Sequence, residues 1–217
     1  MESGRQKVTR KDVAREAGVS ETIVSYVLNK NRYVKEEKRQ RVLEVVEKLQ
    51  YHPNNIARAL HGKGSLQILF IAEELSSGYF SELVSQMSRD AYRRGYMISL
   101  CESQEKDEFV SQILSRQFDG LFVSASGVTD RELKLLVKSG IPMVLFLNRE
   151  ISCDLRDTVV VDTGLYEGSR ECVKHLVKNG CRNFVYLDKT GKQCDRDIHW
   201  KGFFDQIKES EAEDFRM

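Results

Sequence analysis

The chain has 217 residues, of which 41% are hydrophobic and 31% are charged, and its formal net charge is +1. This composition excludes a disordered chain, and because no apolar run is long enough to span a bilayer it also excludes an integral membrane protein. The net charge hides an asymmetry: residues 1–64 carry a net +6 and residues 65–217 a net −5, so the first part either meets a polyanion or has a solvated basic face.

The first 50 residues predict three short helices. Thr9 and Asp12 have the spacing of a capping box, which starts a helix over 10–17. Gly18 can take the left-handed conformation that ends this helix, and Ser20 is a natural N-cap for a second helix over 21–29. A third helix follows over 36–50. The next apolar segment, "NNIARALHG" (54–62), predicts a fourth helix that is too short to be stable alone.

From Leu66 onward, apolar strands alternate with amphipathic helices. Strands that we expect to be buried occupy 66–72, 96–101, 119–125, 142–147 and 158–162, and helices occupy 79–94, 105–117, 130–139 and 165–179. A further strand at 183–188 and a helix at 199–210 complete the series. Alternation of this kind predicts a parallel, doubly wound α/β sheet.

The first two helices have the spacing of a helix-turn-helix. A small residue at Ala14, glycine at 18 and branched residues at Val24 and Val27 let two helices cross closely, with the second presenting its N-terminal end to a DNA major groove. The alternative is a pair of unrelated helices, and the basic charge of residues 1–64 favours DNA.

The similarity extends beyond this motif. The stretch "VTRKDVAREAGVSETIVSYVLNKNRYVKEEKRQRVLEVVEKLQYHPNNIARAL" (8–60) resembles the DNA-binding region of the LacI/GalR family of bacterial repressors, especially its purine-repressor branch. Four later segments resemble the core of that family: "SSGYFSEL" (76–83), "RQFDGLFV" (116–123), "SGIPMVLF" (139–146) and "VVVDTGLYEGSRECVKHLVKNGCRNFVYL" (159–187).

This resemblance implies the domain organisation. It predicts a three-helix helix-turn-helix domain (1–52), a hinge helix and linker (53–64), and the first lobe of a periplasmic-binding-protein-like α/β core (65–162). Residues 163–217 would form the crossover and an incomplete second lobe, because the chain ends soon after it first crosses between lobes. We therefore expect either a C-terminally truncated form or a natural short form.

The resemblance also implies the residues that contact DNA. Three side chains at the start of the second helix match base-reading positions: Glu21, Thr22 and Tyr26. Four side chains match phosphate contacts: Ser25, Asn29, Tyr51 and Arg58. Three side chains of the hinge match positions in the minor groove: Ala57, Leu60 and His61. Leu60 is expected to wedge into the central base step, with a core contact as the alternative. For Glu21, a solvated charge at the helix start is the alternative to a base contact.

Effector contacts are carried over in the same way. The matching positions are Tyr79, Phe80, Asp162 and His199, of which the two aromatics have core packing as their alternative. The chain departs from the family at Thr163, Cys181 and His199, where Asn, His and Arg are usual. We therefore keep open whether this short chain senses an effector.

Together these patterns predict a cytoplasmic transcriptional repressor. It would bind a pseudo-palindromic double-stranded DNA operator as a homodimer, with a sugar or nucleobase as effector, and would have no membrane contact, cofactor or metal. Five cysteines without metal-ligand spacing indicate free thiols. An enzyme is not expected, since no GxSxG or HExxH motif occurs. The alternatives are a truncated DNA-binding form unable to sense effector, or a small-molecule binding protein.

Overall fold

The computed structural model describes residues 8–53, 62, 64–104, 108–124, 126, 128–187, 197–210 and 214–216. The chain divides into two compact units, Met1–Ala57 and Arg58–Met217. Most of the predicted hinge segment, residues 54–61 and 63, lies outside the described residues. Within the part of the chain that the structure describes, none of the helices combines the length and apolar character needed to cross a bilayer.

In the described residues of the first unit, three helices pack around one small core. These are α1 (Arg10–Ala17), α2 (Glu21–Asn29) and α3 (Glu36–Lys48). The buried core side chains are Val13, Ala14, Ala17, Val24, Val27, Val42, Val45 and Tyr51. The predicted three-helix domain is therefore confirmed, with each helix within two residues of its expected bounds.

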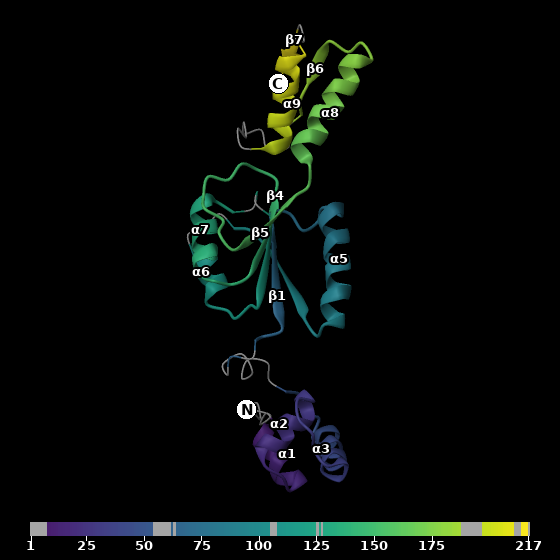
Figure 1. The fold of residues 1–217 in the computed structure, drawn as a ribbon, viewed down its shortest axis with the longest axis vertical. Helices are drawn as coiled ribbons and strands as arrows, with labels where there is room; N and C mark the ends of the chain where they lie inside the picture. The colour runs from purple at the N-terminus through teal and green to yellow at the C-terminus, as the bar shows by residue number, and fades with distance from the viewer. Residues whose placement is uncertain are drawn as a thin grey trace, which may run out of the picture. The chain divides into compact units, whose positions relative to one another are not determined.

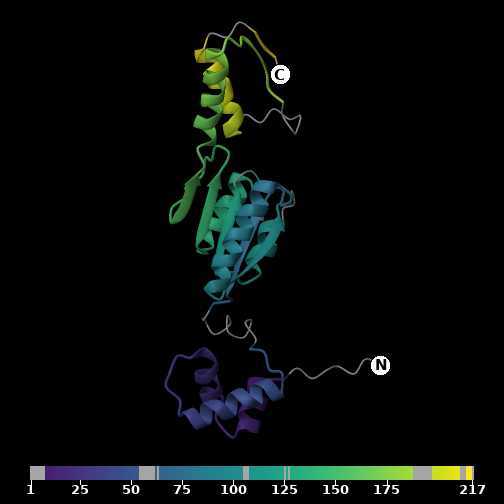
Figure 2. The same cartoon turned by 90° about the vertical axis from the view of Figure 1, so that its right-hand side faces the viewer.

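The second unit contains a five-stranded sheet in which every neighbouring pair is parallel. Its strands are β1 (Gln67–Ala72), β2 (Met97–Glu102), β3 (Gly120–Ser124), β4 (Met143–Leu147) and β5 (Thr158–Asp162), in the order β2-β1-β3-β4-β5. Helix α5 (Gly78–Arg93) covers one face, and α6 (Phe109–Leu114) and α7 (Asp130–Lys138) cover the other (Figure 1). Figure 2 shows the same sheet from the α5 side. Helices on both faces confirm the predicted doubly wound architecture.

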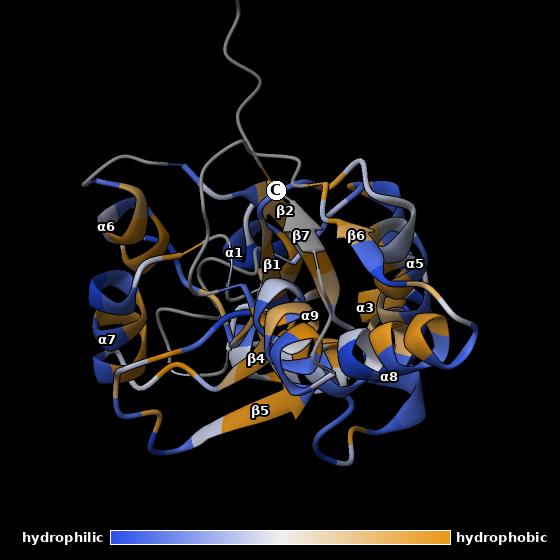
Figure 3. Ribbon diagram, turned by 90° about the horizontal axis from the view of Figure 1, so that it is seen from above, coloured by the Kyte–Doolittle hydropathy of each residue, from blue (hydrophilic) through white to orange (hydrophobic). Residues whose placement is uncertain are grey.

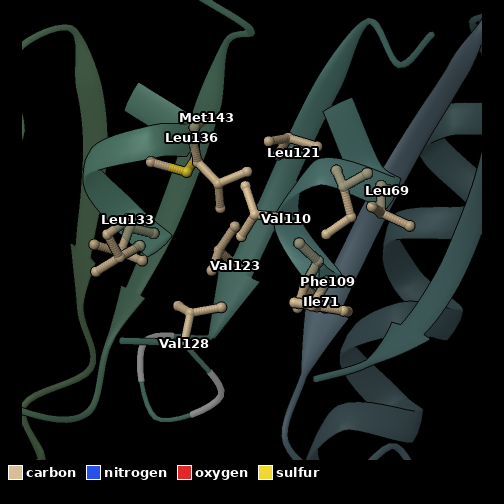
Figure 4. Close-up of a cluster of buried hydrophobic side chains, with 12 residues drawn as sticks. Leu69, Ile71, Phe109, Val110, Leu121, Val123, Val128, Leu133, Leu136 and Met143 are labelled. Carbon is tan, nitrogen blue, oxygen red and sulfur yellow. The ribbon is translucent and has the colours of Figure 1, made fainter. Parts of the chain in front are cut away.

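The main core lies between the sheet and the helices α6 and α7. Alternate residues of a strand point to the same face, so the inward set comes from every second position of the three central strands. Figure 4 shows these side chains meeting those of the two helices. The buried members are Leu69, Ile71, Phe109, Val110, Ile113, Leu121, Val123, Val128, Leu133, Leu136, Met143 and Leu145.

The two outer strands correct one expectation. All five strands were predicted to be buried, and this is wrong for β2 and β5. Met97 and Leu100 of β2 are 69% and 49% exposed, and Val159 and Val160 of β5 are 61% and 42% exposed. The physical reason is position, because an edge strand has a neighbour on only one side. Figure 3 shows the hydrophobic character that runs along β5.

After β5, the part of the chain that the structure describes forms a smaller layer of two helices and two strands. Helix α8 (Leu165–Lys178) packs along α9 (Ile198–Glu209), and β6 (Asn183–Val185) pairs in parallel with β7 (Asp214–Arg216), a strand that the sequence did not predict. The helices cross so closely that a Cβ at Gly202 would lie 2.3 Å from the carbonyl oxygen of Tyr166. Val173, Phe184 and Ile207 form the buried core of this layer.

Candidate DNA-binding surface

Helix α1 begins at a complete capping box. The Thr9 side chain accepts a hydrogen bond from the Asp12 backbone N–H (3.3 Å), and the Asp12 carboxylate accepts one from the Thr9 backbone N–H (3.0 Å). The same carboxylate accepts a hydrogen bond from the Thr9 hydroxyl, which is the main reason that the pKa of Asp12 lies below its usual value. Two of the N–H groups that a helix start leaves without partners are thereby satisfied.

A tight turn joins α1 to α2. Gly18 ends α1 with φ 64° and ψ 36°, in the left-handed region that glycine adopts without a steric penalty. The Val19 N–H donates to the Ala14 carbonyl (3.0 Å), and Ser20 caps α2 by accepting from the Ile23 N–H (3.3 Å). The open space around the position of a Gly18 Cβ means that backbone conformation, and not crowding, requires glycine here.

Helix α2 has two distinct faces. Val24 and Val27 are fully buried against α1 and α3, whereas Glu21 and Thr22 are exposed in the first turn. Ser25 and Tyr26 are half-buried, and the exposed Asn29 side chain donates to the Ser25 carbonyl and hydroxyl oxygens (2.8 and 3.0 Å). Packing of the two valines therefore orients the polar N-terminal end of α2 toward solvent, where a groove of DNA can receive it.

The structure adds one residue that the sequence did not single out. The guanidinium carbon of Arg32, in the loop after α2, lies 5.3 Å from the centre of the Tyr26 ring. This cation–π contact holds a positive charge beside a predicted base-reading side chain. The signal in the sequence was an arginine six residues after a tyrosine, across a helix end, which does not reveal the stacking without the loop geometry.

Tyr51 is placed differently from what its predicted role suggests. It is only 7% exposed and belongs to the hydrophobic core of the three helices. Its ring therefore has a packing role, and its phosphate contact stays a prediction. Ala57, Arg58, Leu60 and His61, the predicted hinge contacts, lie outside the described residues.

The predicted effector residues come from segments near one edge of the five-stranded sheet. Tyr79 and Phe80 begin α5 after the carboxyl end of β1, and Asp162 is the last residue of β5. His199 lies near the end of β4, because its neighbour Asp197 forms an antiparallel bridge with Arg149. Within the described residues no hydrogen bond or ion pair joins Asp162 or His199 to the aromatic pair, and the effector role of these four residues stays a prediction.

The two aromatic residues differ in their exposure to solvent. Phe80 packs edge-on against the buried Phe70 with ring centres 5.7 Å apart, while Tyr79 lies 5.3 Å from Phe80 and is 57% exposed. Asp162 accepts a hydrogen bond from the Gly164 N–H (2.9 Å), and the His199 N–H donates to Asp197 (2.7 Å). Tyr79 is thus the more accessible of the two aromatics.

A polar network that the sequence did not predict lies at the same sheet edge. The Asn148 amide, directly after β4, donates to the hydroxyls of Ser124 and Ser126 (both 2.9 Å) and accepts from the Ser126 N–H (2.7 Å). Ligands of open α/β sheets bind outside the carboxyl ends of the strands. A polar residue after each of two neighbouring apolar strands was the signal that could have pointed here.

A buried ion pair holds the loop beside this network. Arg149 is 8% exposed and contacts Asp130 at 2.7 Å, and it also donates to the carbonyl oxygens of Val128 (2.6 Å) and Glu150 (2.7 Å). These contacts join the end of β4 to the start of α7. The ion pair therefore fixes the loop after β4.

Family models match nearly the whole chain. Residues 9–54 match bacterial regulatory proteins of the lacI family, and residues 65–217 match periplasmic binding proteins and the sugar binding domain of the LacI family. The second match alone spans more than half of the chain.

Curated relatives include repressors named PurR. The HTH-type transcriptional repressor PurR of Mannheimia succiniciproducens is 30% identical over 94% of this chain and 62% of its own length. The repressor of the same name from Haemophilus influenzae is 35% identical over 79% of this chain and 52% of its own. The chain thus spans less than two thirds of the relatives that it matches.

Solved structures share the fold. The lac repressor dimer bound to operator and the anti-inducer ONPF has a TM-score of 0.75 at 21% identity, covering 97% of this chain and 65% of that one. A LacI family regulator from Silicibacter pomeroyi has a TM-score of 0.74 at 23% identity, covering 96% and 64%.

Proposed function

Since this chain belongs to the LacI family of bacterial regulatory proteins, we propose that it is a sequence-specific DNA-binding transcriptional repressor. One observation carries the proposal. The left-handed turn at Gly18 and the burial of Val24 and Val27 leave Glu21 and Thr22 exposed at the N-terminal end of α2. This is the geometry with which a recognition helix enters the major groove.

The proposed chemistry assigns different tasks to neighbouring side chains. Thr22 can hydrogen-bond to base edges, and Glu21 can accept from the amino group of cytosine. Ser25 and Asn29 would contact phosphates, which fixes register without reading sequence. Tyr26 would present a ring and a hydroxyl to the bases, and Arg32 stacked on that ring would add a positive charge at the same place.

We further propose that the chain acts as a homodimer on a pseudo-palindromic operator. One three-helix unit reads a half-site of a few base pairs, and a second copy doubles the contact. The proposal draws support from the lac repressor relative, which is a dimer bound to operator. In this arrangement the hinge segments of two copies, with Leu60 as wedge, would lie in the minor groove at the centre of the site.

The proposed effector is a small molecule at the carboxyl edge of the five-stranded sheet. Tyr79, Phe80, Asp162 and His199 come from that edge, and the Asn148 network adds hydrogen-bonding groups there. A second form of the proposal is a DNA-binding chain that does not respond to effector, which is favoured by the departures at Thr163, Cys181 and His199. We place the protein in the cytoplasm, where its operator is, and propose no enzymatic step.

The test is selection of bound sites from a random duplex pool, followed by affinity measurements on the recovered sequence. We expect a pseudo-palindromic site whose affinity falls steeply with salt, because each phosphate contact releases counterions. Equal affinity for the recovered site and a scrambled duplex at physiological salt would contradict the proposal. Adding candidate sugars and nucleobases then separates the two forms, since only an effector-sensing chain changes its operator affinity.

A further inference from the structure

The carboxylate of Asp119 binds the chain at the point where the linker joins the α/β core. Oδ1 of Asp119 accepts hydrogen bonds from the Ser65 backbone N–H (2.6 Å) and the Ser65 hydroxyl (2.9 Å). Oδ2 accepts from the Leu66 backbone N–H (3.0 Å). Asp119 directly precedes β3, 54 residues further along the chain than Ser65. We call these contacts the Asp119 clamp.

The backbone inside the clamp is closely fitted. Gly64 has φ +74°, a conformation that favours glycine, and a Cβ there would lie 2.6 Å from Oδ2 of Asp119, so a larger residue would displace that carboxylate. Ser65 is 5% exposed, and its hydroxyl oxygen also accepts from the Gln67 N–H (3.2 Å). Leu66 has a positive φ of 57°, which costs free energy in a residue other than glycine and persists only where neighbouring contacts hold it.

The clamp is anchored to the centre of the sheet. The Asp119 N–H donates to the Gln67 carbonyl (2.8 Å), and the Leu66 carbonyl accepts from the Met97 N–H (2.9 Å). The strands themselves pair from Ile68 and Gly120 onward without the Asp119 side chain. The carboxylate therefore bonds the two residues that precede β1, next to the ladder between β1 and β3.

We propose that Asp119 is a positioning residue for DNA binding, because it fixes the place and direction in which the linker leaves the core. This inference rests on the proposed function. In a dimer the two linkers must deliver their reading helices to two half-sites at a set spacing. A fixed point of departure lowers the conformational entropy lost when both helices dock, and a loose one raises that loss.

The expected effect is selective for specific DNA. Nonspecific binding needs only the basic surface of the first unit, and it does not require both reading helices in register. Asp119→Ala should therefore weaken specific binding by about tenfold or more, as expected for backbone freedom regained over one or two residues in each copy. Nonspecific affinity should change by less than about twofold. Asp119→Asn keeps one carbonyl acceptor, so it should restore part of the specific affinity.

Hydrogen exchange on the full chain tests whether the clamp exists in solution. In Asp119→Ala the amides of Ser65 and Leu66 lose their acceptor and should exchange faster, while the amide of residue 119, which donates to Gln67, should stay protected. Unchanged exchange at Ser65 and Leu66 would overturn the inference.

Binding of the full chain to the duplex selected by the unmodified protein, and to a scrambled duplex, tests the positioning role. Asp90→Asn is the matched control for Asp119→Asn, because Asp90 is an exposed carboxylate of the same unit in a surface ion pair with Arg93. Should Asp119→Ala fail to fold, Ser65→Ala removes one of the three hydrogen bonds to Asp119, together with the bond from the Gln67 N–H, and gives a smaller loss in the same direction.

The outcomes separate the two proposals. If the unmodified chain does not prefer its selected duplex, the proposed function fails. If it does, and Asp119→Ala and Asp119→Asn bind both duplexes like Asp90→Asn, the proposed function stands and the clamp has no positioning role. An equal loss on both duplexes would also overturn the inference, because a positioning residue acts on the specific complex alone.

Discussion

Two side chains, one in the first turn of α2 and one in the loop after it, allow base reading and phosphate binding to be told apart. Thr22 is a small, exposed hydroxyl in the first turn, whereas Arg32 is a cation stacked on Tyr26. A hydroxyl that contacts a base edge contributes differently to different sequences. A cation near the phosphates contributes almost equally to all of them.

We predict opposite signatures for Thr22→Val and Arg32→Ala. Thr22→Val keeps the shape and removes the hydroxyl, so it should lower affinity for the selected duplex by roughly 5- to 100-fold and leave scrambled DNA unaffected. Arg32→Ala should weaken binding to both duplexes and reduce the salt dependence by about one counterion. Fluorescence anisotropy titrations at salt concentrations from about 50 to about 200 mM measure the affinities for both duplexes and their salt dependence. A loss on both duplexes with Thr22→Val would argue against base contact.

At the scale of helices, the start of α1 is sensitive to acid. The pKa of Asp12 is lowered, first by the hydrogen bond from the Thr9 side chain, so the folded state favours the ionised carboxylate. The stabilisation is therefore present above the unfolded pKa of about 3.9 and is lost as the pH falls through the folded value.

Protection of the α1 amides from hydrogen exchange should thus decrease below about pH 4. This decrease should be absent in Asp12→Asn, which has no carboxylate to titrate. Thr9→Ala should lower the stability of the helix by about 1 kcal/mol at neutral pH, because it removes the N-cap. Asp90→Asn serves as the control. If the acid response of α1 persists in Asp12→Asn, another group is responsible.

The crossing of α8 and α9 makes a second prediction about packing. Gly202→Ala would place a Cβ 2.3 Å from the Tyr166 carbonyl oxygen, and the helices must separate to accept it. We expect a loss of about 1–3 kcal/mol in the free energy of unfolding. Gly168 is the matched control, since a Cβ there meets nothing within 4 Å and alanine in place of glycine within α8 should stabilise by up to about 0.5–1 kcal/mol.

Trp200, the single tryptophan of the chain, reports on the unfolding of α9. It lies on α9 and stacks on Phe204 of the same helix at 5.1 Å, so its fluorescence should change when α9 unfolds. Denaturant titrations of the two alanine variants should shift in opposite directions. A shift in the same direction would mean that helix propensity and not close approach governs both sites.

At the scale of the whole molecule, we predict that the hinge segment links DNA binding to the core. Leu60→Ala should weaken binding to the selected duplex far more than binding to scrambled DNA, because only the specific complex is expected to receive the leucine between base pairs. The affinities of the variant for the two duplexes, measured at the same salt concentration, test this expectation. Equal losses on both duplexes would instead fit a core contact for Leu60.

Much of this architecture could be predicted because its signals are local. Gly18 and Ser20 mark the turn within three residues, and regular alternation from Leu66 predicts parallel strands covered by helices. The exposure of Val159 and Val160 could not be predicted, since it depends on which strand lies at the edge.

The placement of the predicted DNA contacts could be foreseen only in part. The exposure of Thr22 follows from its position in the first turn of α2, whereas the burial of Tyr51 depends on packing against all three helices. The Asp119 clamp joins residues 54 positions apart, and Arg32 reaches Tyr26 only through the loop after α2. Such contacts are set by tertiary structure, and no local pattern encodes them.

The central strand β3 separates the attachment of the linker from the Asn148 network. Asp119 precedes its amino end and Ser124, bonded to Asn148, closes its carboxyl end, so the linker and the polar network lie at opposite ends of one strand. Five residues of β-strand span roughly 17 Å. A strand paired on both sides resists stretching, so we expect the proposed ligand at Asn148 to act on the linker through movement of the whole sheet.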